Sequence, residues 1–459
     1  MNQADTRETA PGTDVLWCEI VHTRTGIERD VVVEIADGRI TAVRPDVPAP
    51  PPGASVRRGL TVPGFANAHS HAFHRVLRGR TQAGSGTFWT WRDLMYAAAG
   101  KLDPDTYLAL ARAVYAEMAL AGITAVGEFH YLHHAPGGAR YDDPNAMGHA
   151  LAEAARQAGI RITLLDTCYV AGGVGAEPTG TQLRFGDGDA DGWAARVDAL
   201  KPADHLRIGA AVHSVRGVPA DQIPTVAAWT AERGAPLHAH VSEQPAENHA
   251  CLEAYGRTPV EVFEAAGALG PRFTAVHATH LTDRDIALLG ASGSGVCLCP
   301  TTERDLADGI GPAGELSRAQ VPLSLGTDSQ AFIDMFEEAR AVELDERLRT
   351  GSRGHFTTAR LLAQATRVGH ESLGWDDAGR IEPGRRADLV TVGLDSVRLA
   401  GTIPRLASES VVFAAAPPDI THVVVDGRTV VADGVHTLVE DVPGTLAAAI
   451  RTVVGGGEA

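Results

Sequence analysis

The sequence is poor in cysteine and contains no long apolar run. Its five cysteines are scattered through 459 residues, and no apolar stretch approaches the roughly 20 residues that cross a bilayer. A disulfide-rich secreted protein and a membrane protein are therefore both disfavoured. No signal peptide precedes the first cysteine, so we expect a reducing, cytoplasmic location and no membrane partner.

Basic residues are also few relative to acidic ones. The chain has 40 Lys and Arg against 57 Asp and Glu, which gives a formal net charge of −17. Nucleic acid requires a basic face, so we expect no nucleic-acid partner. With 44% hydrophobic and 21% charged residues, the composition is typical of a large catalytic domain with a smaller companion. It favours an enzyme of small molecules, in which particular arginines meet any charge on the substrate.

Metal-ligating residue types recur where strand-like runs end. In a strand, residues two apart project to the same side, so a His-x-His pair can reach one metal ion. A single His-x-His motif is a weak signal, but further candidate ligands follow three later runs. Together they indicate a metal hydrolase site. The residues concerned are His69 and His71, His240 and Glu243, His277, and Asp328.

Eight apolar runs, each bounded by polar, Gly or Pro residues, occupy the middle of the chain. Helix-like segments such as 105–121 and 336–348 lie between or after them. Apolar strands that alternate with amphipathic helices indicate an α/β fold of the (β/α)₈ barrel class. In such barrels chemistry takes place at the carboxyl ends of the strands, where the candidate ligands fall. The runs are 60–68, 123–129, 162–170, 208–213, 236–241, 273–277, 295–299 and 321–326.

Short alternating segments flank this barrel at both ends of the chain. Residues 16–60 contain the turn signal Asp37-Gly38, and Asp426-Gly427 recurs in a second β-rich stretch near the C-terminus. We expect the two ends to pair into one small β-sandwich domain. The predicted division is 1–60 and 383–459 for the two parts of that domain, and 61–382 for the barrel. The Gly-rich segment 172–192 is interpreted as a mobile loop.

Several motifs resemble those of the amidohydrolase superfamily, and the resemblance covers nearly the whole chain. One of them looks like the His-x-x-Glu arrangement of the deaminase branch, whose members bind one divalent metal. The motifs are Pro63-Gly64-Phe65 before His69-Ser70-His71, the later strand-end His277, Thr327-Asp328-Ser329, and the deaminase-like His240-Val241-Ser242-Glu243.

Three further stretches, 88–96, 128–134 and 212–216, are similar to the formimidoylglutamate deiminase family. That resemblance implies hydrolysis of N-formimino-L-glutamate to N-formyl-L-glutamate and ammonia in histidine degradation. Two alternatives stay open. One is another deaminase of the same branch, acting on a nucleobase-like heterocycle. The other is a non-catalytic assembly protein on the same scaffold, although such proteins typically lose ligands that this chain keeps.

Lysine is scarce, and this bears on the number of metal ions. Binuclear members of the superfamily usually bridge their ions with a carboxylated lysine at the end of the fourth strand. This chain has only Lys101 and Lys201, and its fourth run ends in His213 instead. We therefore expect one divalent ion, zinc or alternatively iron, together with one water. Its expected protein ligands are His69, His71, His240 and Asp328.

The resemblance also implies roles for the catalytic residues. Water bound to a metal ion has its pKa lowered from about 15.7 toward about 7, which makes it a nucleophile at neutral pH. Asp328 is expected to take the proton from this water, and Glu243 to deliver a proton to the departing nitrogen. His277 is expected to stabilise the attacking water or polarise the reacting carbon.

A substrate with two carboxylates requires local cations in so acidic a chain. We expect Arg216, with His213 and His74, to bind one carboxylate, and Arg92 with Tyr131 to bind the other. Members of the resembled family carry Gln where this chain has His74. Both side chains can donate a hydrogen bond, so the role can survive the exchange.

Each of these assignments has a structural alternative, such as a satisfied core histidine or loop packing. His130, His133 and His134 look like a second metal cluster, but we assign them structural roles because no carboxylate partner is evident in the sequence. We expect the chain to act on a small dicarboxylate as a homodimer.

Overall fold

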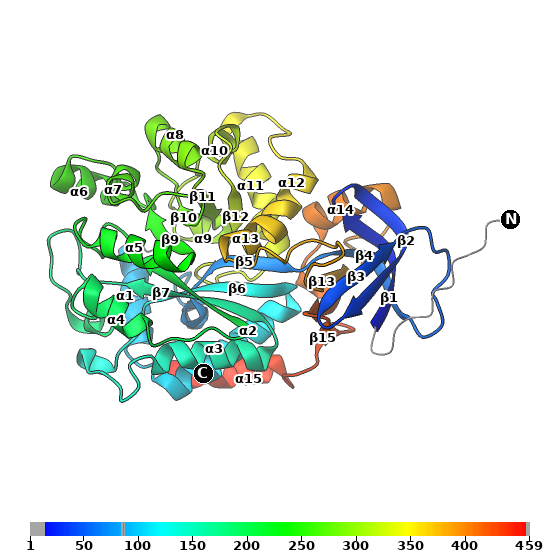
Figure 1. Cartoon of the computed structure of the whole chain (residues 1–459), viewed down its shortest axis with the longest axis horizontal. Coiled ribbons are helices and arrows are strands. Elements are labelled where there is room, and N and C mark those ends of the chain that lie inside the picture. Colours follow the sequence, from blue (N-terminus) through cyan, green and yellow to red (C-terminus); the bar gives the residue numbers. More distant parts are fainter. Residues whose placement is uncertain (1–13, 84–85, 87, 456–459) are drawn as a thin grey trace.

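The computed structural model describes residues 14–83, 86 and 88–455, and these form a barrel with a smaller sheet beside it (Figure 1). The predicted fold class is confirmed. Eight strands form one sheet in the order β12-β11-β10-β9-β8-β7-β6-β5, and every neighbouring pair is parallel. They are β5 (Phe65–Ser70), β6 (Ile123–His130), β7 (Arg161–Cys168), β8 (Leu206–Val212), β9 (Leu237–Val241), β10 (Phe273–His277), β11 (Gly295–Leu298) and β12 (Leu323–Leu325).

The ends of this sheet meet through backbone hydrogen bonds and close the barrel. Ser70 at the end of β5 forms a parallel bridge with Asp328, just after β12. The N–H of Asp328 donates to the carbonyl of His69 (3.0 Å), and the N–H of His71 donates to the carbonyl of Asp328 (3.1 Å). The approach requires glycine at Gly326, because a Cβ there would lie 2.7 Å from the His69 Cβ. Closure therefore brings the predicted ligands of the first and last strands together.

Helices surround the barrel. The predicted helical segments 105–121 and 336–348 correspond to α2 (Pro104–Leu120) and α11 (Met335–Thr350). The N-terminus of α2 is fixed by a capping box, in which Asp103 accepts the N–H of Thr106. Among the described residues no helix is both long and apolar enough to cross a membrane. The helices are α1 (Phe88–Ala99), α2 (Pro104–Leu120), α3 (Ala146–Ala158), α4 (Ala190–Val197), α5 (Ile223–Arg233), α6 (Pro245–Tyr255), α7 (Pro259–Ala265), α8 (Asp283–Ser292), α9 (Pro300–Asp305), α10 (Ala313–Arg318), α11 (Met335–Thr350), α12 (Thr358–Ala363), α13 (Gly369–Ser372), α14 (Ala407–Ala414) and α15 (Val442–Val454).

The two ends of the chain share the second sheet, as predicted, in the order β16-β15-β14-β13-β4-β1-β2-β3. The N-terminal and C-terminal strands of this sheet share a small hydrophobic core, which includes Val33 and Leu389. Both Asp-Gly pairs lie at hairpin turns and have positive φ, the conformation that a two-residue hairpin favours. The strands are β1 (Asp14–Thr23), β2 (Gly26–Ala36), β3 (Arg39–Arg44), β4 (Ser55–Pro63), β13 (Leu389–Val392), β14 (Ile420–Val425), β15 (Arg428–Ala432) and β16 (Val435–His436).

The boundary between sheet and barrel differs from the predicted one at residue 60. The apolar run 60–68 is divided at Gly64, since β4 of the small sheet runs on to Pro63 and β5 of the barrel begins at Phe65. A Cβ on Gly64 would lie 2.5 Å from the side chain of Thr124, so the close packing against β6 requires glycine at this position. The C-terminal segment also returns to the barrel, where α15 packs against α2 (Figure 1).

Part of the segment predicted to be a mobile loop, residues 182–185, is packed against the barrel. Residues Gly180–Arg184 form a 3₁₀ helix, and the side chains of Arg184 and Phe185 are each only 1% exposed. The guanidinium of Arg184 donates to the carbonyl of Leu102 (2.6 Å), which joins this segment to the start of α2. These large side chains hold this part of the segment in place, and the mobility of the rest stays a prediction.

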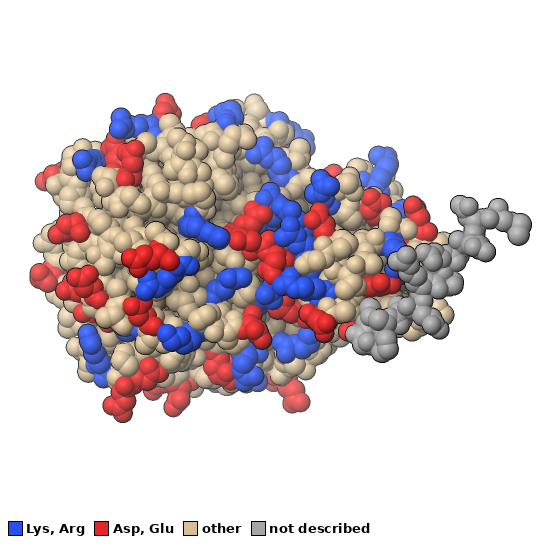
Figure 2. Space-filling view, viewed as in Figure 1, with Lys and Arg blue, Asp and Glu red and all other residues tan. Residues whose placement is uncertain are grey.

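Ion pairs join the barrel to the small sheet. Figure 2 shows acidic and basic side chains side by side where the two parts meet, in keeping with the pair of Arg39 and Asp377 at 2.7 Å. The most buried pair links Arg161 at the start of β7 to Asp388, just before β13. Asp388 also accepts the N–H of Asp426 (3.0 Å), so one carboxylate connects β7, β13 and β14.

We expect Asp388→Ala to lower the free energy of unfolding by about 3–5 kcal/mol, because it leaves the buried Arg161 cation without its main partner. Urea denaturation followed by tryptophan fluorescence measures this, since the Trp375 ring lies 5.0 Å from the Arg161 guanidinium. Glu153→Ala, which breaks an exposed pair with Arg156, is the matched control and should cost less than about 1 kcal/mol. Equal losses in the two variants would contradict this assignment.

Candidate functional site

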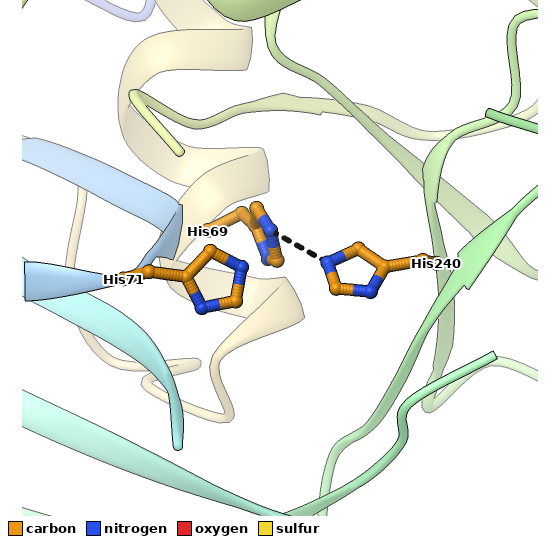
Figure 3. Close-up of side chains that lie close together, drawn as sticks. All are labelled: His69, His71 and His240. Atoms are coloured by element: carbon orange, nitrogen blue, oxygen red, sulfur yellow. Dashed lines mark hydrogen bonds between the residues drawn. The ribbon is translucent and has the colours of Figure 1, made fainter. Parts of the chain in front are cut away.

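Three histidines from two strands point toward one another at the carboxyl end of the barrel (Figure 3). His69 lies in β5, His71 directly follows it, and His240 lies in β9. The Nε2 atoms of His69 and His240 are 3.2 Å apart. Oδ1 of Asp328 lies 3.3 Å from Nε2 of His69 and 3.5 Å from Nε2 of His71. The structure thus brings the four predicted ligands into one cluster.

The hydrogen bonds of two of these histidines fix their tautomers. Nδ1 of His71 lies 2.9 Å from the carbonyl of Phe129, and Nδ1 of His240 lies 2.9 Å from the carbonyl of His213. A carbonyl only accepts, so each Nδ1 carries the hydrogen and each Nε2 offers its lone pair to the cluster. Burial lowers the pKa of all three histidines, that of His71 to about 3, so they are neutral. Neutral imidazoles with one carboxylate form a donor set that fits a divalent cation.

A buried glutamate that the sequence reasoning missed supports the turn on both sides of His71. The carboxylate of Glu128 accepts the hydroxyl of Ser70 (2.8 Å) and the N–H of Ala72 (2.7 Å). Burial raises the pKa of Glu128 to about 7, although these hydrogen bonds lower it. Its signal in the sequence was an acidic residue inside an otherwise apolar run.

The predicted catalytic residues surround the same point. Nε2 of His277 lies 3.8 Å from Oδ2 of Asp328 and 3.9 Å from Oε1 of Glu243. Burial alone would lower the pKa of His277, but the carboxylates of Glu243, Glu303 and Asp328 outweigh it and raise the pKa well above its usual value. Oε1 of Glu303, which was not predicted, lies 3.4 Å from Nδ1 of His277.

A cavity of about 320 Å³ opens beside the cluster, and all of the predicted substrate-binding residues line it. Nε2 of His74 lies 2.9 Å from the hydroxyl of Tyr131, which joins two of the predicted contacts directly. The guanidinium of Arg92 lies over the ring of Tyr96, 5.5 Å from its centroid. The lining includes His74, Arg92, Tyr131, His213 and Arg216, together with His71, His240, Glu243, His277 and Asp328.

Arg216 is bound by two carboxylates, and only one of them was predicted to lie in the site. Its Nη2 lies 3.0 Å from Oε2 of Glu243, and its Nε lies 3.3 Å from Oε2 of Glu247. Burial would lower the pKa of Arg216, but the two carboxylates outweigh this and raise it. A substrate carboxylate at Arg216 would therefore join an existing ionic network.

The second histidine cluster has carboxylate partners, contrary to the expectation from sequence. Nε2 of His134 lies 3.0 Å from Oδ1 of Asp187, and Nε2 of His133 lies 3.9 Å from Oδ1 of Asp166. Arg196 pairs with both aspartates, at 2.7 Å and 2.9 Å, and so offsets part of their negative charge. His130, His133 and Asp166 also lie close enough together to hold a metal ion, so the structural role of this cluster stays a prediction.

The fold and the site together define a barrel hydrolase with a histidine-rich centre at the carboxyl ends of its strands. Residues 60–430 match the Amidohydrolase family, and the chain belongs to this family. It is a hydrolase of carbon–nitrogen bonds, of the deaminase type, in a family that depends on metal.

Two curated relatives are both deaminating enzymes of Pseudomonas aeruginosa. Formimidoylglutamate deiminase is 35% identical over 426 residues, which cover 90% of this chain and 93% of that protein. 8-Oxoguanine deaminase is 28% identical over 421 residues, which cover 90% and 92%. Among solved structures, an amidohydrolase from Brucella melitensis has a TM-score of 0.89 at 30% identity, covering 96% of this chain and 100% of that one.

We expect the purified protein to contain one equivalent of a divalent metal, and His240→Gln to lose most of it because one ligand is removed. Elemental analysis by plasma mass spectrometry measures the stoichiometry. His238→Gln is the matched control, since His238 is a buried histidine of the same strand whose Nε2 lies 3.0 Å from the carbonyl of Ser372. Two ions per chain, or equal losses in both variants, would contradict a single-ion site.

Proposed function

We propose that the chain hydrolyses N-formimino-L-glutamate to N-formyl-L-glutamate and ammonia. The observation that carries this proposal is that two arginines, Arg92 and Arg216, line the same cavity as the histidine cluster. Guanidinium groups bind carboxylates through paired hydrogen bonds, and this substrate has two carboxylates. The 35% identity to a formimidoylglutamate deiminase supports the same substrate.

In this proposal each carboxylate has its own group of contacts. Arg216 binds one with His213 and His74, and Arg92 binds the other with Tyr131. The hydrogen bond between His74 and Tyr131 makes the two groups neighbours. That arrangement suits a short diacid, whose two charges lie only a few bonds apart.

The metal is proposed to be zinc, with iron as the alternative, held by His69, His71, His240 and Asp328. When bound, such an ion supplies nucleophilic water at neutral pH. With the ion in place, Asp328 would accept a proton from water, and Glu243 would carry a proton to the departing nitrogen. Both carboxylates lie near the same ring nitrogen, Nε2 of His277, at 3.8 Å for Asp328 and 3.9 Å for Glu243. His277 then stabilises the attacking water or polarises the reacting carbon.

The biological setting of this proposal is cytoplasmic histidine degradation by a homodimer, without a nucleic-acid or membrane partner. Family resemblance supports the pathway, and the excess of acidic residues supports the lack of a nucleic-acid partner.

A second candidate substrate is a nucleobase-like heterocycle. Aromatic side chains of Trp91, Tyr169 and Phe185 line the cavity and could stack on a ring. The similarity to 8-oxoguanine deaminase supports this candidate. It leaves unexplained why the cavity has two arginines, which a neutral ring does not require.

Ammonia release decides between the candidates. We expect kcat/KM for N-formimino-L-glutamate to exceed that for 8-oxoguanine, guanine, cytosine and S-adenosylhomocysteine by about a hundredfold or more, since one charged hydrogen bond is worth roughly ten- to a hundredfold. A heterocycle that is turned over faster than N-formimino-L-glutamate would overturn the proposal.

We expect Glu243→Gln to retain metal and fold while turnover falls by about a hundredfold or more, because the variant cannot carry the proton. Steady-state ammonia release and metal content measure the two effects separately. Glu264→Gln, at an exposed position of α7, is the matched control and should behave as the parent. Turnover of Glu243→Gln near the parent rate would remove Glu243 from the reaction.

A further inference from the structure

Glu247 is a buried carboxylate in the cavity wall that has no role in the proposed reaction. Its side chain is 2% exposed, and it lies in the first turn of α6. Burial raises its pKa, although Arg216 lowers it. A buried acidic group is costly unless it is paired and hydrogen-bonded, so the contacts of Glu247 indicate what it does.

The two oxygens of Glu247 have different partners. Oε1 accepts the N–H of Ser242 (3.2 Å), and Oε2 lies 3.3 Å from Nε of Arg216. Ser242 has a φ of 52° and belongs to the turn between His240 and Glu243. Glu247 therefore connects the orientation of Arg216 to the turn that carries the proposed proton carrier.

A guanidinium is planar, so a hydrogen bond at one nitrogen and an ion pair at another together restrict its orientation. For Arg216 these contacts are Glu247 at Nε and Glu243 at Nη2. In the proposed reaction Glu243 gains and loses a proton, and its attraction for Arg216 changes through the cycle. Glu247 takes no part in that transfer, so its contact with Nε persists.

We propose that Glu247 is a positioning residue that orients Arg216 toward one carboxylate of the substrate. This inference rests on the proposed function, in which Arg216 binds a carboxylate. Glu247 then determines the preference for a dicarboxylate and leaves the chemical step to Glu243, His277 and Asp328.

Glu247→Gln tests the role because it removes the charge and keeps the shape. A glutamine carbonyl can still accept the N–H of Ser242, because the amide keeps an acceptor oxygen in the place of Oε1. The substrates are N-formimino-L-glutamate, N-formimino-2-aminobutyrate, which lacks the side-chain carboxylate, and 4-(formimino)aminobutyrate, which lacks the α-carboxylate. The Arg216→Met variant first shows which carboxylate Arg216 binds. In this variant, kcat/KM should no longer improve when the substrate carries that carboxylate.

Glu247→Gln should lower kcat/KM about ten- to a hundredfold for substrates that carry this carboxylate. The loss should lie mainly in KM, with kcat changed less than about threefold. The monoacid that lacks this carboxylate should be affected less than about threefold, because Arg216 makes no contact with it. Glu247→Asp retains the charge but moves it away from Nε of Arg216. Its preference for the dicarboxylate should therefore fall measurably, but by less than in Glu247→Gln.

Glu261→Gln is the matched control. Glu261 holds the same position in α7, where its carboxylate accepts the N–H of Thr258 (3.0 Å) and pairs with Arg284 at 2.6 Å. It lies outside the cavity lining, and all three substrates should react as with the parent.

Three results would overturn the inference. The first is a Glu247→Gln variant with an unchanged preference for the dicarboxylate over the monoacids. The second is an equal loss of kcat/KM with all three substrates, and the third is a loss that lies in kcat alone. If Glu247→Gln does not fold, an unchanged preference in Glu247→Asp overturns it instead. If the parent enzyme does not prefer N-formimino-L-glutamate to the two monoacids, both the proposed function and this inference are wrong. If the parent enzyme prefers the dicarboxylate and Glu247→Gln keeps that preference, only this inference is wrong and the proposed function stands.

Discussion

The backbone pairing of β5 with the residues after β12 is the constraint on which the site depends. The N–H of Asp328 meets the carbonyl of His69, and the N–H of His71 meets the carbonyl of Asp328. These hydrogen bonds close the barrel and also set the separations among three of the four proposed ligands. Closure and metal binding therefore favour the same arrangement. A cation that binds only the closed barrel stabilises the fold by mass action.

Two arginines in the cavity wall are the local cations that the proposed anionic substrate requires in so acidic a chain. The net charge is −17, yet the wall of the cavity contains Arg92 and Arg216. Arg216 keeps its charge although it is largely buried, because Glu243 and Glu247 lie beside it. The same contacts hold its planar group in place before substrate arrives. A prearranged cation loses less side-chain entropy on binding, which improves affinity without new contacts.

Sequence reasoning predicted the barrel and the ligand cluster because both follow from local patterns. Eight apolar runs and a His-x-His pair at a strand end are visible without any knowledge of long-range contacts. The missed residues depend on pairing between distant segments. Glu247 and Glu261 occupy the same place in successive helices, and only the fold puts Arg216 beside one of them. The carboxylates that meet His133 and His134 likewise come from Asp166 and Asp187, on later parts of the chain. The run 60–68 concealed a change of sheet at Gly64, because both of its halves are apolar and buried.

The central claim is that one metal ion and two arginines share a cavity that binds a short diacid. A crystal structure of the metal-loaded protein with N-formyl-L-glutamate, the proposed product, tests it most directly when anomalous scattering locates the metal. The account predicts a single ion held by His69, His71, His240 and Asp328. It also predicts one carboxylate of the ligand at Arg216 and the other at Arg92. Two ions, or a ligand whose carboxylates contact neither arginine, would contradict it.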